Sequence, residues 1–142
     1  MLAAQAASTP VGSRIYFVGR HIPADRFFRI FDIFALASSR EAFGLVAAEA
    51  MRAGLPVVAT KVGGLAGIVE DGKTGYVVPP LSPALLGQAL QRLVSDASLR
   101  KTMGAAGQSR ADEYFSAERY LRDIEQLYLE LLVVGRGRGG GR

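Results

Sequence analysis

Cysteine is absent from this 142-residue sequence, and histidine occurs once, as His21. Without cysteine, the chain can form neither a disulfide scaffold nor a metal site built on thiolates. A lone histidine with no neighbouring metal ligands favours a structural or loop role, so no metal site is predicted. No apolar run reaches the roughly 18 residues of a membrane-spanning helix. The first residues also lack the basic start and long apolar core of a signal peptide.

Charge of one sign is in excess only at the C-terminus. The formal net charge is +4, and three of these charges lie in the terminal GRGRGGGR. The charge of the rest, four less three, is +1. A Gly-rich tail cannot pack, so we expect residues 135–142 to be disordered. The tail could contact RNA, but no other stretch interleaves aromatic and basic residues, so no nucleic-acid partner is predicted.

A strand–loop–helix–strand unit occupies the middle of the chain. Residues 33–37 form an apolar run, typical of a strand that is covered on both faces. Gly44 opens a pattern of good helix formers, which Gly54 ends. A second β-branched run covers residues 56–60. The whole unit has about thirty residues, the size of one βαβ crossover.

Two acids bracket the loop and the first helical turns of this unit, Glu41 and Glu49. In open parallel sheets, ligands bind outside the carboxyl ends of the strands. The free N–H groups of a helix start favour phosphate or sugar oxygens, and Gly44 would let a ligand approach the backbone. A carboxylate such as Glu49 is suited to accept hydrogen bonds from a ribose diol. From the residue types alone, local capping or pairing by Glu49 is an equally good interpretation.

The segment from Glu41 to Gly64 reads EAFGLVAAEAMRAGLPVVATKVGG. Its two glutamates enclose seven residues, and its A-x-G-x-P-V-V-A-T and V-G-G elements follow at fixed offsets. The segment resembles the donor-site signature of retaining GT-B glycosyltransferases of group 1 (family 4-like). The likeness continues through IVEDGKTGYVVPP, residues 68–80, and covers about residues 14–132.

The resemblance implies roles for five residues. Glu41 would lie beside the donor sugar as the catalytic residue. The backbone N–H groups of Phe43, Gly44 and Leu45 would bind oxygens of the donor sugar or diphosphate. Glu49 would bind the ribose hydroxyls.

The sequence departs from the family pattern at three positions, which bear on donor preference and on activity. Ala37 stands where the family usually has Pro, and Ala42 where it usually has Gly. Gly67 stands where the family usually has Glu.

The resemblance implies an α/β, Rossmann-like, three-layer fold with C-terminal helices, a part of the GT-B C-terminal domain. We expect residues 1–13 to be an N-terminal segment, residues 14–134 the nucleotide-sugar-binding domain and residues 135–142 the tail. Four strands are predicted, near Ile15, Ile33, Val57 and Tyr76, in a parallel sheet ordered by sequence. A helix over residues 23–31 would cross over from the first strand to the second.

Helical patterns fill the rest of the chain. Ser82 with Pro83 predicts the start of one helix, and Ser116 that of another. Between them, residues 99–114 read as a helix weakened by Gly104 and Gly107.

The implied function is transfer of a sugar from a nucleoside diphosphate sugar to an acceptor, with retention. The family generally needs no metal or other cofactor. The acceptor-binding N-terminal domain is not in this sequence, so the chain is interpreted as the donor-binding part, inactive in isolation. A peripheral association with a membrane would depend on that further domain. A cytoplasmic location is expected. The alternative is a non-catalytic nucleotide- or sugar-binding module, or an assembly partner of another chain.

Overall fold

A parallel three-stranded sheet forms the centre of the structure, a computed structural model that describes residues 1–21 and 25–137. The strands are β1 (Phe34–Leu36), β2 (Val57–Thr60) and β3 (Gly75–Val78), in the order β1-β2-β3. Phe34 is level with Val57, which is level with Gly75. β2 is buried along its whole length, as its unbroken β-branched run predicts.

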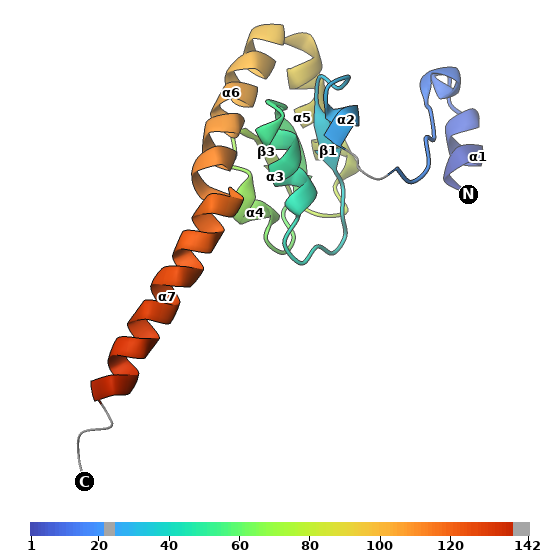
Figure 1. Ribbon diagram of the computed structural model, residues 1–142. Helices are drawn as coiled ribbons and strands as arrows, with labels where there is room; N and C mark the ends of the chain where they lie inside the picture. The colour runs from blue at the N-terminus through green and yellow to red at the C-terminus, as the bar shows by residue number, and fades with distance from the viewer. Residues whose placement is uncertain (22–24, 138–142) are drawn as a thin grey trace.

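Helices cover both faces of this sheet and make the three predicted layers (Figure 1). One face carries α3 (Leu45–Arg52), α4 (Leu65–Ile68) and part of α6 (Ala97–Tyr114). The other face carries α5 (Pro83–Ser95), which packs Ala89 and Leu93 against Val58 of β2. The predicted α/β, Rossmann-like class is therefore confirmed.

Gly104 of α6 allows α6 to cross closely over the end of α3. A Cβ at Gly104 would overlap the carbonyl oxygen of Gly54, and one at Gly107 would lie 3.5 Å from the side chain of Met51. Both glycines are buried, and Met51 is fully buried beneath them. Gly104, which weakens the helix by its low propensity, thus permits the packing that stabilises α6, whereas a Cβ at Gly107 would make an ordinary van der Waals contact.

The serines predicted to start two helices take up the expected positions. Ser116 precedes α7 (Ala117–Gly137), and its hydroxyl accepts a hydrogen bond from the backbone N–H of Arg119 at 3.2 Å. Ser82 precedes α5, but its hydroxyl donates to the carbonyl of Pro80 at 3.3 Å instead of capping the helix.

The prediction of a fourth strand near Ile15 is wrong. α1 (Leu2–Ala7) and a 3₁₀ turn, η1 (Gly12–Arg14), precede residues 15–20, which have no regular secondary structure. This segment lies apart from the sheet (Figure 1), and the side chains from Ile15 to Val18 are exposed.

The layers around β1 explain why the fourth strand does not form. β1 turns Phe34 and Leu36 toward the α3 layer, whereas Ala35, on its other face, is exposed. The layer that contains α5 therefore reaches Ile33, directly before β1, but leaves Ala35 uncovered. A strand beyond β1 would bury too little apolar surface to offset the entropy of ordering it.

The predicted crossover helix over residues 23–31 is shorter than expected. Its described part is α2 (Asp25–Phe28), and residues 22–24 lie outside the described residues. Phe28 is buried and meets the ring of Phe34 edge-on, with 5.7 Å between ring centroids.

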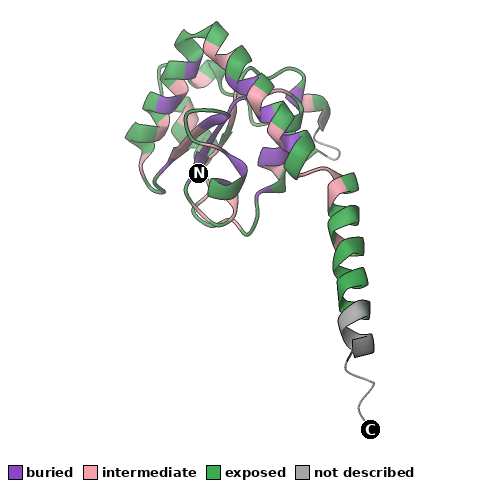
Figure 2. Cartoon of the chain, turned by 90° about the vertical axis from the view of Figure 1, so that its left-hand side faces the viewer, coloured by how far each residue is buried: buried purple, intermediate pink, exposed green. Residues whose placement is uncertain are grey.

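The final helix, α7, extends away from the packed body, and most of its described side chains are exposed (Figure 2). Its assigned helix ends at Gly137, and the disorder expected for residues 135–142 stays a prediction. Residues 138–142 of this tail lie outside the described residues. In the part of the chain that the structure describes, no helix is both long and apolar enough to cross a membrane.

Candidate functional site

The loop between β1 and α3 is hydrogen-bonded to the end of β2 and to the residues that follow it. The buried hydroxyl of Thr60 donates to the carbonyl of Ser38 at 2.6 Å. Beyond Thr60, the backbone N–H of Gly64 donates to the carbonyl of Ala42 at 3.2 Å. The first bond connects the start of the loop to β2, the central strand. The second connects a later part of the loop to the segment that follows β2.

Glycine is required where this loop meets residues 63–64. Gly63 has a φ of +51°, and a Cβ there would overlap the carbonyl oxygen of Glu41. A Cβ on Gly64 would lie 2.7 Å from the carbonyl oxygen of Phe43, closer than real Cβ contacts. The V-G-G element therefore allows two stretches of backbone to touch, which fixes the segment that carries Glu41.

α3 begins directly after this segment. Gly44, with a φ of +95°, turns the chain into the helix, and a Cβ there would collide with the buried side chain of Leu65. Among the described residues, no group accepts a hydrogen bond from the backbone N–H of Phe43, Gly44 or Leu45. This helix start therefore presents unsatisfied donors and the positive end of a peptide dipole.

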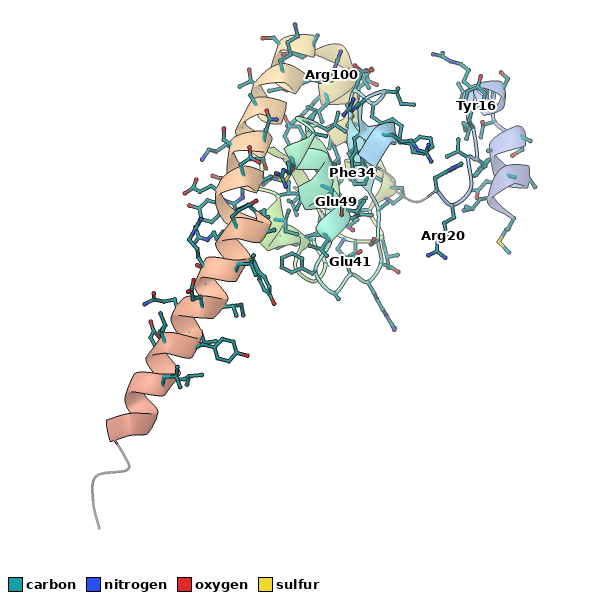
Figure 3. The ribbon with its side chains drawn as sticks, in the orientation of Figure 1. Tyr16, Arg20, Phe34, Glu41, Glu49 and Arg100 are labelled. Atoms are coloured by element: carbon teal, nitrogen blue, oxygen red, sulfur yellow. The ribbon has the colours of Figure 1, made fainter. Side chains whose placement is uncertain are left out.

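The two predicted acids lie at the same end of the domain, Glu41 on the loop and Glu49 on α3 (Figure 3). Glu41 is half-buried, whereas Glu49 is exposed. Among the side chains that the structure describes, neither carboxylate has a partner in a hydrogen bond or an ion pair. The interpretation of Glu49 as a local cap or pairing residue is therefore not supported. Both carboxylates are available to a ligand.

A hollow of about 430 Å³ adjoins this helix start. Glu49, Phe43 and Leu45 line it from α3 and its approach, while Phe115 and Tyr120 line it from the junction of α6 and α7. The rings of Phe43 and Phe115 meet edge-on at 6.3 Å between centroids. The hollow is thus lined both by residues that the sequence predicted and by two aromatic side chains that it did not, Phe115 and Tyr120.

A second hollow, of about 520 Å³, lies between α2 and the other side of Glu49. It is lined by two basic side chains, Arg29 and Arg52, with Phe28 beside them. Arg52 forms an exposed ion pair with Asp112 at 3.5 Å, and Arg29 has no partner among the described residues. These cations border Glu49 and could neutralise an anionic ligand.

Sequence reasoning missed Arg29 and Phe115 because they lie outside the motif, and Arg52 because the motif assigns no role to its position. The only signal for Arg52 was its place one turn after Glu49 on the predicted helix. The N-terminal residues do not join the site, since Tyr16 and Arg20 project from the separate segment (Figure 3). In the described part of the chain, no three acids or histidines cluster in a way that could hold a metal ion.

Comparison with known proteins identifies a family. Residues 1–110 match the family described as glycosyl transferases group 1. D-inositol 3-phosphate glycosyltransferase from Salinispora tropica is 37% identical over 137 residues, which are 94% of this chain and 28% of that protein.

Two solved structures resemble the whole fold. The sucrose-phosphate synthase of Thermosynechococcus elongatus superposes with a TM-score of 0.85 at 32% identity, over 94% of this chain and 34% of its own. The HepE protein of Anabaena, solved in complex with UDP, superposes with a TM-score of 0.83 at 27% identity, over 91% of this chain and 36% of its own. The chain thus spans about a third of the length of each of these proteins.

Proposed function

Since this chain belongs to the group 1 glycosyl transferases, we propose that it binds the nucleoside diphosphate sugar from which a retaining enzyme transfers the sugar. The observation that carries the proposal is the pair of unpartnered carboxylates, Glu41 and Glu49, on either side of the unsatisfied N–H groups of residues 43–45. The complex of HepE with UDP supports this class of ligand.

Glu49 is proposed to bind the ribose. A carboxylate with two free oxygens can accept a hydrogen bond from each hydroxyl of a diol, and such charge-assisted bonds are strong. Glu49 is exposed, so its desolvation on binding would reduce the gain in free energy. Its position between the two hollows gives the attached base and the phosphates room on either side.

The diphosphate is proposed to lie at the start of α3. The N–H groups of Phe43, Gly44 and Leu45 would donate to its oxygens, and Arg52, which lines both hollows, would add positive charge. Charge develops on the leaving diphosphate as the bond to the sugar breaks, so fixed donors there stabilise the transition state. No metal is needed in this scheme.

Glu41 is proposed as the catalytic residue. In transfer with retention, the bond from the anomeric carbon to the diphosphate oxygen breaks, the acceptor oxygen bonds to the same face of the sugar, and the proton of the acceptor hydroxyl passes to the departing diphosphate. Positive charge develops on the sugar ring in the process. A half-buried carboxylate without a competing partner can stabilise that charge and orient sugar hydroxyls.

The acceptor is proposed to be bound by a further domain, because the chain spans about a third of the length of the glycosyltransferases that it resembles. On this proposal the isolated chain transfers no sugar, since no acceptor is held in line with the donor. The reaction is proposed to take place in the cytoplasm.

The proposal is tested by Glu41→Gln in a two-domain enzyme that contains this chain. Turnover should fall by about 10²- to 10³-fold, the usual effect of losing one preorganised electrostatic group, while donor affinity changes little. Glu118→Gln, on the exposed first turn of α7, is the matched control. Unaltered turnover with weaker donor binding would contradict the role of Glu41.

A second candidate function is that of a non-catalytic binding module, or of an assembly partner that completes a domain with another chain. It is favoured by the exposed apolar segment from Ile15 to Val18 and by the edge position of β1 in the described sheet. Mixing the chain with a separately expressed acceptor-binding domain distinguishes the two. Restored transfer supports the enzyme, whereas donor binding without any transfer supports the module.

A further inference from the structure

The guanidinium group of Arg110, in α6, donates hydrogen bonds to the last carbonyls of α4. Its Nε donates to the carbonyl of Ile68 at 2.9 Å and its Nη2 to that of Gly67 at 2.8 Å. The last carbonyls of a helix have no partner within the helix, so these two bonds satisfy groups that α4 leaves open. The planar fork of arginine can donate to two neighbouring acceptors at once, which a lysine cannot do with the same geometry.

The guanidinium is itself held in place from several sides. Nη1 lies 3.8 Å from the carboxylate of Glu70, and the group stacks over the rings of Tyr114 and Phe115, at 5.1 Å and 5.9 Å from their centroids. The side chain is only 26% exposed. Arg110 therefore connects α6 to α4 as a fixed element and not as a mobile surface charge.

The opposite end of α4 touches the loop that carries Glu41. Gly64, the residue before α4, donates its N–H to the carbonyl of Ala42. The first residue of α4, Leu65, is fully buried, and its side chain fills the space beside Gly44. α4 has only four residues, so fixing one end of it restrains the other.

We propose that Arg110 is a positioning residue that acts through α4 to hold residues 41–44 in the conformation in which they bind the donor. The link between Arg110 and donor binding rests on the proposed function. The claim that Arg110 restrains α4 and residues 41–44 does not depend on it. Arg110 also lies over the ring of Phe115, which meets that of Phe43, so exchange at the two ends of α4 is the measurement that isolates the route through α4.

Arg119 provides the matched control, because it shares the surroundings of Arg110 without the contact to α4. Its guanidinium lies over the same ring of Tyr114, at 5.2 Å, and pairs with Asp123 at 3.3 Å. Its remaining bond from the side chain is to the carbonyl of Glu113, at 3.3 Å. Arg119→Lys therefore tests the loss of an arginine from the same cluster.

The test compares amide hydrogen exchange in the wild type, Arg110→Lys and Arg119→Lys. Arg110→Lys keeps the charge and the side-chain stem, so the chain should remain folded. We expect exchange at the amides of Gly64 and Val69 to rise by about tenfold, the effect of losing one charge-assisted hydrogen bond to a local opening. Exchange at Val58 and Val78, in the sheet, should not change, and Arg119→Lys should leave all four amides as in the wild type.

Two results would overturn the positioning role. Unchanged exchange at Gly64 in Arg110→Lys would show that α4 holds the loop without Arg110. An equal increase at Gly64, Val69, Val58 and Val78 would show a general loss of stability. Should Arg110→Lys fail to fold, Arg110→Gln, which keeps one donor, is measured in the same way.

UDP titration separates this inference from the proposed function. UDP affinity should fall by about fivefold or more in Arg110→Lys, since a loosened loop binds less well. It should stay unchanged in Arg100→Lys, because the guanidinium of Arg100 donates instead to the carbonyls of Leu93 and Val94, at 2.7 Å and 3.1 Å, at the end of α5. If the wild type does not bind UDP, the proposed function fails, and the exchange data alone decide the structural role. If UDP binds all three proteins equally, the link between Arg110 and the donor is refuted.

Discussion

Two short apolar runs of this chain, residues 15–18 and residues 57–60, have similar strand propensity and opposite structures. IYFV is exposed and outside the sheet, whereas VVAT is the central strand and is fully buried. The difference lies in what covers them, because helices lie on both faces of β2 and the layer with α5 leaves Ala35 of β1 uncovered. Local propensity indicates which segments can be strands, and the covering layers decide which of them are.

The same contrast explains what the sequence could predict. The unit from β1 to β2 was predicted correctly because Gly44, Gly54 and the buried run of β2 each have a strong local signature. The strand near Ile15 was predicted wrongly because its local strand propensity is as high as that of β2. Its pairing depends on layers that are distant in sequence, which local patterns do not reveal.

The candidate site follows the same division. Glu41 and Glu49 could be assigned from the motif, since their spacing along the loop and helix fixes their position. The exposure of Glu49 and the contribution of Arg29 and Phe115 could not, because these depend on how α2 and the α6–α7 junction pack against α3. The contacts of Arg110 had no signal in the sequence at all.

The largest expected effect is on the core of the packed unit. Met51→Ala should lower the free energy of unfolding by about 2–5 kcal/mol, since the side chain is fully buried and a cavity would remain. The matched change in the exposed segment, Val18→Ala, should cost less than about 0.5 kcal/mol. Urea unfolding measures both. Similar values for the two would show that the N-terminal segment is packed in solution.

Two glycines with positive φ sharpen the comparison. Gly63→Ala should cost about 3 kcal/mol, because backbone strain adds to overlap with the carbonyl of Glu41. Gly19 has a similar φ, of +73°, but nothing lies within 4 Å of an added Cβ. Gly19→Ala should therefore cost only the strain, about 1 kcal/mol. Equal costs in urea unfolding would remove the close approach as the reason for the glycine.

Two threonines give a smaller contrast. Thr60→Val should cost about 1–2 kcal/mol, because it deletes the buried donor to the carbonyl of Ser38. The hydroxyl of Thr9 also donates to a carbonyl, that of Ala6 at 2.8 Å, but it is exposed. Thr9→Val should change the free energy of unfolding by less than about 0.5 kcal/mol, because water replaces the bond. A larger cost for Thr9→Val in thermal or urea unfolding would contradict the distinction.

The most direct test of the account is an NMR titration of this chain with UDP. We expect saturable shifts of the amides of Phe43, Gly44 and Leu45, none at residues 15–18, and an affinity lowered by about 1.5–3 kcal/mol in Glu49→Ala, the value of a hydrogen bond to a charged group. Shifts absent from residues 43–45, or equal affinities of the wild type and Glu49→Ala, would contradict the assignment of this end of the sheet as the donor site.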